Sequence, residues 1–254
     1  MKKIGIVGCG WLGYRIATAL CTRYSIYTTV SSFDKAAPLE AKGFHPTVIS
    51  FAETNAPIPP WSVADELDVL IITVPLVGKQ SLPDVIERRM NKLASFIGDY
   101  PGQLFFMSSI GVYTQASGEV AEDSLPSEQV PGELLITNKY PQTNILRLGG
   151  LMGDDRLLSK YPVANLDMAV NHIHYEDICA VIEKMIQEKS SSKLYNVVAP
   201  LHPGKAEVIS AQKNLPLTET GPPTGRILSS FKMVSELRFT FSFPDPRTFH
   251  IPRI

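Results

Sequence analysis

Three glycines near the amino terminus are spaced as a phosphate-bearing ligand would require. Gly8, Gly10 and Gly13 form a G-x-G-x-x-G pattern after an apolar run at residues 4–7 and before apolar residues at helical spacing. The first glycine permits the tight turn, the second lets the backbone approach a pyrophosphate, and the third lets the helix pack closely on the sheet. The start of the helix offers N–H groups to the phosphates. The pattern predicts dinucleotide binding, and a glycine-rich turn without a ligand is the alternative. The predicted site residues here are Gly8, Cys9, Gly10, Trp11, Leu12 and Gly13.

The residues after the second predicted strand, at 24–30, bear on the choice of cofactor. In folds that prefer NAD, an acidic residue near the end of this strand bonds the ribose 2′-hydroxyl. Here Ser31, Ser32 and Lys35 could hold a 2′-phosphate, so the sequence favours NADP, with NAD as the alternative. Asp34 could instead face a ribose, although we expect it to cap the helix that begins near Lys35.

Two histidines and an aspartate near residue 175 are further candidates for chemistry. His172 and His174 have side chains of the type that titrates near neutrality. They alternate with Ile173 as strand neighbours, so at most one should face a cleft. We expect Asp177 to be the N-cap of the following helix. No Ser-His-Asp order and no cluster of metal ligands can be defended, so we predict no metal site.

Composition narrows the class of protein. The chain has 254 residues, a formal net charge of -1 and 44% hydrophobic residues, which suits a globular protein with a large core. The charge gives no support for binding nucleic acid or an anionic membrane. No apolar run reaches the length of a membrane span, and Lys2-Lys3 is followed by too many glycines for a signal peptide. We expect a small-molecule partner; the oligomeric state is left open.

The cysteines indicate a reducing compartment. Cys9, Cys21 and Cys179 are odd in number, far apart and without C-x-x-C spacing, which argues against a disulfide scaffold or a zinc site. We therefore expect a cytoplasmic protein. Cys9 lies inside the glycine turn, where a small residue is needed, so a packing role is favoured over a redox role.

The order of the predicted elements gives the fold class. Further buried strands are predicted at residues 45–51, 68–75, 104–107, 144–148 and 194–198. Helical spacing lies between them, at residues 82–97, 133–138 and up to about 187. This alternation predicts an α/β protein with a Rossmann-type, doubly wound parallel sheet and a small irregular C-terminal lobe. On the helix at 82–97 we expect Arg88 and Arg89 to form the solvated face.

These elements also suggest a division into parts. Residues 1–150 would form an NAD(P)-binding domain, to which residues 170–199 return. Residues 151–169 and the proline-rich stretch 200–254 would form a small substrate-side lobe.

Several motifs together resemble a known family. They are Ile6-Val7-Gly8-Cys9-Gly10-Trp11-Leu12-Gly13, Ser108-Ser109-Ile110-Gly111-Val112-Tyr113, Leu146-Arg147-Leu148-Gly149-Gly150-Leu151-Met152-Gly153, His174-Tyr175-Glu176-Asp177 and Tyr195-Asn196-Val197. In this order, over nearly the whole chain, the sequence resembles the extended, atypical short-chain dehydrogenases/reductases of the NAD(P)-dependent epimerase/dehydratase superfamily, and within it the YeeZ-type group. The motifs are specific for fold and cofactor but not for substrate.

The resemblance implies roles for residues outside the glycine turn. Ser109 falls where the superfamily keeps the hydroxyl that bonds the reacting substrate oxygen. The cofactor would contact Thr73, Val74, Pro75, Ser108, Leu148, Gly149 and Gly150. The alternatives are structural: the two serines would end a strand, and the two glycines would make a turn.

The sequence departs from the family at the catalytic pair, Tyr-x-x-x-Lys, whose lysine lowers the tyrosine pKa for proton exchange during hydride transfer. None of the nine tyrosines has a lysine four residues later. The stretch where the pair would fall, residues 125–132, is shortened and holds two prolines, which oppose the usual helix. Tyr113 is the best substitute, with a role as a core aromatic as the alternative, and its pKa should stay near the ordinary value of roughly 10.

Two hypotheses follow. The first is an oxidoreductase or epimerase that uses NAD(P) on a small polar or sugar-like substrate, with Ser109 orienting the reacting oxygen and Tyr113 as acid/base. The second is a non-catalytic NAD(P)-binding protein with a structural or redox-sensing role. The missing Tyr-x-x-x-Lys pair favours the second, whereas the glycine turn fits both.

Overall fold

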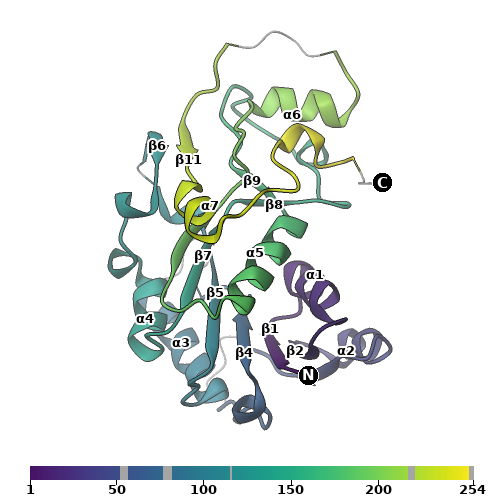
Figure 1. Cartoon of the computed structure of the whole chain (residues 1–254), viewed down its shortest axis with the longest axis vertical. Helices are drawn as coiled ribbons and strands as arrows, with labels where there is room; N and C mark the ends of the chain where they lie inside the picture. Colours follow the sequence, from purple (N-terminus) through teal and green to yellow (C-terminus); the bar gives the residue numbers. More distant parts are fainter. Residues whose placement is uncertain (52–56, 77–81, 115, 217–220, 252–254) are drawn as a thin grey trace. The chain divides into compact units, whose positions relative to one another are not determined.

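A seven-stranded sheet forms the centre of the fold (Figure 1). The computed structural model describes residues 1–51, 57–76, 82–114, 116–216 and 221–251. The strand order is β10-β7-β5-β4-β1-β2-β3, and the pairs β1–β2, β1–β4, β2–β3 and β4–β5 are parallel. The strands are β1 Lys3–Val7, β2 Ser25–Val30, β3 His45–Val48, β4 Val69–Ile72, β5 Gln103–Ser109, β7 Asn144–Leu148 and β10 Leu194–Val197. This order, with helices between the strands, confirms the predicted Rossmann-type α/β fold.

The helices follow the apolar periodicity of the sequence. They are α1 Trp11–Leu20, α2 Phe33–Glu40, α3 Pro83–Ile97, α4 Pro131–Lys139, α5 Tyr175–Gln187, α6 Lys205–Gln212 and α7 Phe231–Leu237. In α3, Pro83 occupies the first turn, where its missing N–H costs nothing, and Gly98 follows the last turn with a φ of 74°. None of the described helices is long and apolar enough to cross a membrane.

Two predicted helix caps are wrong. The N-cap of α2 is Ser32, so Asp34 lies within the first turn, where a carboxylate favours the helix dipole. Helix α5 begins at Tyr175, so Asp177 is likewise inside its first turn. The Asp177 carboxylate instead accepts hydrogen bonds from the backbone N–H groups of Ser242 (2.7 Å) and Phe243 (2.9 Å). Tertiary partners from distant sequence decided the role of this side chain.

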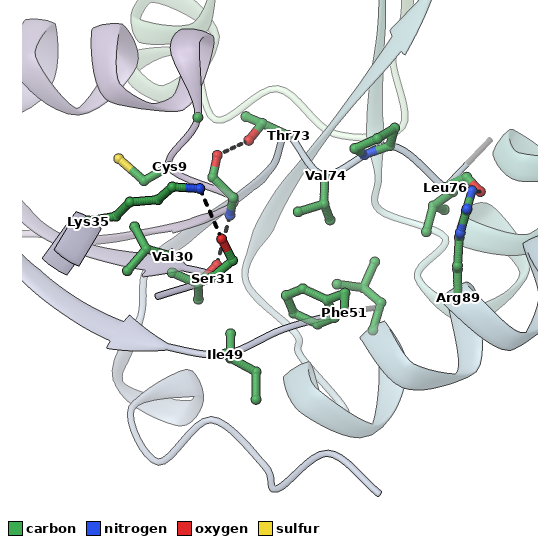
Figure 2. Close-up of a pocket in the computed structure, with 15 residues that line it drawn as sticks. Cys9, Val30, Ser31, Lys35, Ile49, Phe51, Thr73, Val74, Leu76 and Arg89 are labelled. Atoms are coloured by element: carbon green, nitrogen blue, oxygen red, sulfur yellow. Dashed lines mark hydrogen bonds between the residues drawn. The ribbon is translucent and has the colours of Figure 1, made fainter. Parts of the chain in front are cut away.

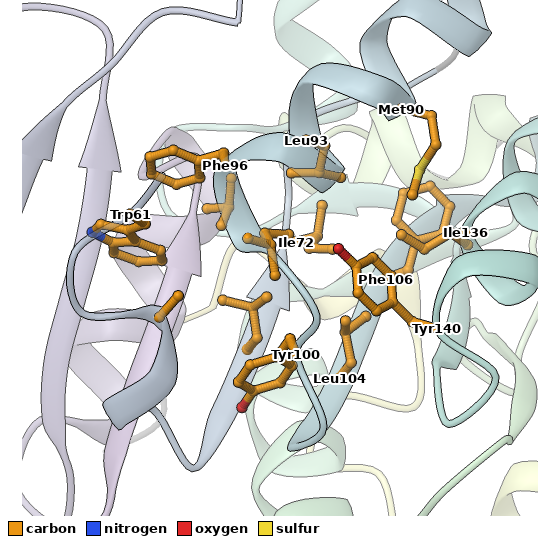
Figure 3. Close-up of a cluster of buried hydrophobic side chains, with 14 of the residues drawn as sticks. Trp61, Ile72, Met90, Leu93, Phe96, Tyr100, Leu104, Phe106, Ile136 and Tyr140 are labelled. Carbon is orange, nitrogen blue, oxygen red and sulfur yellow. The ribbon is translucent and has the colours of Figure 1, made fainter. Parts of the chain in front are cut away.

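The described residues form two compact units. Unit 1 comprises residues 1–108, 126–146 and 185–194. Its core includes the fully buried strand β4 and a cluster of aromatic and aliphatic side chains (Figure 3). Trp61 and Phe96 stack with ring centroids 5.1 Å apart within this cluster. Burial of this apolar surface stabilises β1 and β4, and the glycine turn follows the end of β1.

Unit 2 comprises residues 109–125, 147–184 and 195–254. It holds two small parallel sheets of three-residue strands, of which the sequence predicted only the segment His172–His174. One pairs β6 (Gly118–Val120) with β11 (Arg226–Leu228), and the other pairs β8 (Gly150–Met152) with β9 (His172–His174). Two apolar clusters support the unit, around Val208 and Phe243 and around Tyr113 and Leu228.

Candidate functional site

The three glycines of the turn have distinct physical reasons to be glycine. Gly8 has a φ of +99°, and a Cβ added there would lie 2.6 Å from the Val74 side chain. A Cβ on Gly13 would collide with the carbonyl oxygen of Gly8, so the helix could not pack as it does. A Cβ on Gly10 would meet nothing within 4 Å. Gly8 and Gly13 are therefore required by the fold, whereas Gly10 keeps the backbone open on the side of the cavity.

Two threonines on neighbouring segments hold this turn. Thr29 Oγ1 accepts a hydrogen bond from the Gly8 N–H (2.8 Å), and the Thr29 carbonyl accepts one from the Cys9 N–H (2.7 Å). The Thr73 hydroxyl donates to the Gly8 carbonyl. The peptide groups of Gly8 are thus fixed from β2 and from the residue after β4. Sequence reasoning included Thr73 but missed Thr29, whose only signal was a hydroxyl next to the end of a strand.

Helix α1 presents its N-terminus to the same side. The N-cap is Gly10, no side chain caps it, and the first turn holds no acidic residue. A helix start without these groups retains N–H donors and a positive dipole end. This combination fits a pyrophosphate. Leu12 is 7% exposed and lies in the core, and the Arg15 guanidinium lies 3.7 Å from the centre of the Trp11 ring. Neither Trp11 nor Leu12 is among the described residues that line the cavity beside the turn.

A cavity of about 510 Å³ lies beside the turn, within unit 1 (Figure 2). This volume is in the usual range for small-molecule pockets. Its lining includes the predicted residues Gly8, Cys9, Gly10, Ser31, Lys35, Thr73, Val74 and Pro75. It also includes residues that the sequence analysis did not select: Thr29, Val30, Ile49, Phe51, Leu76, Arg89 and Leu93. The structure therefore gathers the glycine turn, the end of β2 and the residues after β4 around one space.

One end of the cavity is polar. Lys35 Nζ donates to Ser31 Oγ at 3.1 Å, and both residues line the cavity. Ser32 is the N-cap of α2 and is not among the described lining residues. Nearby, burial raises the pKa of the Cys9 thiol to about 11, so the thiol is neutral at physiological pH. This neutrality agrees with the packing role expected for Cys9.

The other part of the cavity is apolar, and the guanidinium of Arg89 lies at its end. Phe51 and Leu93 line it, and the Phe51 ring stands edge-on to Phe96 with centroids 5.3 Å apart. Arg89 also lines it, so the prediction of a solvated Arg89 is wrong; Nη1 donates to the Leu76 carbonyl at 3.2 Å. Arg88 is exposed as predicted and pairs with Asp84 at 2.8 Å. The two arginines differ because only position 89 shares the helix face of Leu93.

The two serines at the end of β5 have different environments. Ser108 Oγ donates to Glu133 Oε1 at 2.6 Å, and Glu133 is fully buried. From the sequence, Glu133 is expected only as the start of the helix at residues 133–138. Ser109 is exposed, and its Oγ accepts from the Gly111 N–H at 3.1 Å. The Ser109 oxygen therefore caps a short 3-10 turn, while its O–H group keeps the capacity to donate to another oxygen.

Tyr113 belongs to a buried hydrogen-bond network in unit 2. Its hydroxyl donates to Asn196 Oδ1 (2.8 Å) and accepts from Arg147 Nη1 (2.7 Å), and the residue is 3% exposed. Arg147 is fully buried and also donates to the Leu125 carbonyl at 2.8 Å. Burial raises the pKa of Tyr113, more than the adjacent Arg147 lowers it, so the expectation of an ordinary pKa is wrong. A phenol in this state is a poor base at neutral pH.

Residues 148–150 are explained by packing within unit 2. Leu148 is 5% exposed, a Cβ on Gly149 would lie 2.7 Å from the Asn171 carbonyl oxygen, and a Cβ on Gly150 would collide with the ring of His172. Burial lowers the pKa of His172 to about 4. A neutral His172 does not serve as a charged acid near pH 7.

His174 is also a core residue. It is 3% exposed and stacks on Phe243 with ring centroids 3.7 Å apart. Across the part of the chain that the structure describes, no group of three or more His, Cys, Asp or Glu side chains could hold a metal ion.

Comparison with known proteins agrees with this fold. No protein-family model matches the chain. Protein YeeZ of Escherichia coli K12 is 25% identical over 271 residues, which cover 97% of this chain and 98% of YeeZ. Among solved structures, UDP-glucuronic acid 4-epimerase from Bacillus cereus in complex with NAD aligns with a TM-score of 0.73 at 15% identity, covering 98% of this chain and 95% of the epimerase. Yeast methylglyoxal/isovaleraldehyde reductase Gre2, complexed with NADPH, aligns with a TM-score of 0.74 at 13% identity, covering 98% and 96%. Both of these solved structures share the fold of this chain.

Proposed function

We propose that the protein binds a nicotinamide dinucleotide in the cavity of unit 1, with NADP(H) preferred over NAD(H). The observation that carries this proposal is the open glycine turn at an uncapped helix N-terminus, beside a cavity of about 510 Å³. The turn and the start of α1 would hold the pyrophosphate. Structural neighbours were solved with NAD and with NADPH, which supports the class of ligand.

The preference for NADP(H) rests on the polar end of the cavity. Lys35 and Ser31 lie in hydrogen-bond contact there, at 3.1 Å. An ammonium and a hydroxyl suit a phosphate dianion better than they suit a ribose hydroxyl, because charge-assisted hydrogen bonds are the stronger ones. Ser32, which follows Ser31, would contribute its hydroxyl or its backbone N–H at the start of α2.

For activity, the proposal is an oxidoreductase or epimerase that acts on a small polar or sugar-like substrate. The bound nicotinamide would supply hydride exchange. Ser109, which is exposed and caps a short turn through its oxygen, would donate its O–H to the reacting substrate oxygen. The likeness to epimerases and reductases supports this class but not a particular substrate.

A non-catalytic NAD(P)-binding role is the second candidate, and Tyr113 favours it. The hydroxyl of this tyrosine is bonded to both Arg147 and Asn196, and burial raises its pKa. Without a lysine to lower that pKa, the reaction would lack general acid/base catalysis, which contributes on the order of 10²–10⁴-fold to the rate. Slow turnover is therefore expected of the enzyme and undetectable turnover of the non-catalytic protein, with measurable cofactor binding in both cases.

Two measurements test the proposal on the full chain. Titration with NADPH and NADH, followed by cofactor fluorescence, should give saturable binding that is tighter for NADPH. Transfer of deuterium from stereospecifically labelled NADPH to a panel of carbonyl substrates then separates the two candidates, since only an enzyme moves the label. Absence of saturable binding for either dinucleotide would overturn the cofactor assignment.

A further inference from the structure

Arg89 is a charged residue of the described cavity lining that neither the glycine turn nor the 2′-phosphate explains. It lies on α3, four residues before Leu93, and both side chains line the cavity. Its Nη1 donates to the Leu76 carbonyl at 3.2 Å, which fixes the guanidinium at this wall. Its neighbour Arg88 is exposed and paired with Asp84. Of these two adjacent arginines, Arg88 therefore lies on the surface and Arg89 lines the cavity.

The surroundings of Arg89 suit a flat, largely apolar ring. Ile49, Phe51 and Leu93 supply apolar walls, and the orientation of Phe51 is fixed by its edge-on contact with Phe96. Figure 2 shows Arg89 at one end of the cavity and Lys35 at the other, with Val74 and Phe51 between them. The apolar part of the lining thus lies between the two cations.

We infer that Arg89 is a cofactor-binding residue that holds the edge of the purine base, an inference that rests on the proposed function. A guanidinium has N–H donors and no acceptor, so it bonds the ring nitrogens of adenine and not the exocyclic amine. Its charge does not change with pH in the physiological range, because arginine stays protonated. The base is common to NAD and NADP, whereas the 2′-phosphate is not. Arg89 therefore sets the affinity for both dinucleotides, and Lys35 sets the ratio between them.

Titration of the full chain with NADP⁺ and NAD⁺ separates these roles. Arg89→Met keeps the aliphatic stem and removes the donors. We expect it to weaken both dinucleotides by a similar factor, on the order of tenfold or more, because a charge-assisted hydrogen bond is lost from each. The NADP⁺ to NAD⁺ ratio should stay as in the unmodified chain. Arg88→Met, one residue away on the same helix, is the matched control and should leave both affinities unchanged.

Three results would overturn the inference: unchanged affinities in Arg89→Met, a loss confined to NADP⁺, or equal losses in Arg88→Met. The ligand-free melting temperature of each variant shows whether it is folded. If Arg89→Met does not fold, Arg89→Gln retains an N–H donor for the Leu76 carbonyl and serves in its place. Failure of the unmodified chain to bind either dinucleotide is a different result, which rejects the proposed function itself.

Discussion

At the scale of single residues, the cavity separates positions that the fold requires from positions that a ligand would require. Gly8 and Gly13 have no room for a side chain, so their substitution damages the turn itself. Gly10 has room, and Lys35 is an exposed side chain held only by Ser31 among the contacts of the described residues. These two positions can be changed with little effect on folding, which makes them suited to tests of binding.

Gly10→Glu should abolish measurable NADP(H) binding while the protein stays folded. The new carboxylate would place bulk and negative charge where the pyrophosphate must approach the helix start. Fluorescence titration measures the binding, and circular dichroism checks the fold. Gly221→Glu is the control, since a Cβ at Gly221 also meets nothing within 4 Å and this residue belongs to unit 2. Wild-type affinity in a folded Gly10→Glu variant would refute the dinucleotide assignment.

Lys35→Ala should narrow the gap between NADP(H) and NAD(H) affinities by about tenfold, because it removes a charged partner of the 2′-phosphate. NAD(H) affinity should stay within about twofold. Lys42→Ala removes another exposed lysine, one whose pKa is raised by a hydrogen bond with Tyr14, and serves as the control. Equal affinities for the two dinucleotides in the unmodified protein would contradict this assignment and favour Asp34 as the residue that faces the ribose.

At the scale of elements, the network around Tyr113 joins three separate segments of unit 2. Arg147 comes from β7, Asn196 from β10 and Tyr113 from the residue after a 3-10 turn. Asn196 also takes part through its backbone N–H, which donates to Glu122 Oε1 at 2.6 Å. A buried arginine is tolerated only where its donors are satisfied, so these bonds fix the positions of the segments that carry them.

Tyr113→Phe should lower the free energy of unfolding by about 1–3 kcal/mol, because Arg147 and Asn196 each lose a buried partner. Cofactor affinity should not change, since the network lies in unit 2 and the cavity in unit 1. Urea denaturation and cofactor titration measure the two effects, and Tyr161→Phe, at a residue that is 50% exposed, is the control. If turnover exists and survives Tyr113→Phe at full rate, the reacting proton comes from another group.

At the scale of the whole molecule, the Asp177 carboxylate joins α5 to the C-terminal segment. Asp177 is fully buried and accepts backbone hydrogen bonds from Ser242 and Phe243. Phe243 in turn stacks on His174, which lies just before the helix. Residues about 65 positions apart in sequence are therefore joined by a charge-assisted contact.

Asp177→Asn should destabilise the protein by about 1.5–3 kcal/mol, because one carboxylate oxygen is replaced by an N–H₂ group that faces a backbone donor. It should also speed proteolysis of the C-terminal segment under native conditions. Chemical denaturation and mass spectrometry of the digest measure these effects. Glu176→Gln changes the exposed neighbour and should have little effect; an equal loss in both variants would show that helix charge, and not the contact, is responsible.

The fold was largely predictable from the sequence, and the site only in part. Apolar periodicity and the glycine spacing are local signals, so they predicted the parallel sheet and the turn. The role of Asp177 depends on partners about 65 residues away in the sequence. The role of Arg89 depends on the cavity that lies beside the helix face it shares with Leu93. Thr29 and Glu133 give no specific sequence signal, because a threonine near the end of a strand and a glutamate in a helix are ordinary. Of the three-residue strands of unit 2, only His172–His174 was predicted, because strands this short show almost no visible period.

The threonine contacts at Gly8 have a consequence for the rate of ligand association. Both peptide groups of this glycine are bonded to Thr29 or Thr73 within the protein, so the turn is ordered before any ligand arrives. Its conformational entropy has been lost on folding and is not lost again on binding. Stopped-flow mixing with NADPH should therefore give a single phase whose rate rises linearly with concentration, at about 10⁵–10⁷ M⁻¹s⁻¹, with no slow step for closing the turn.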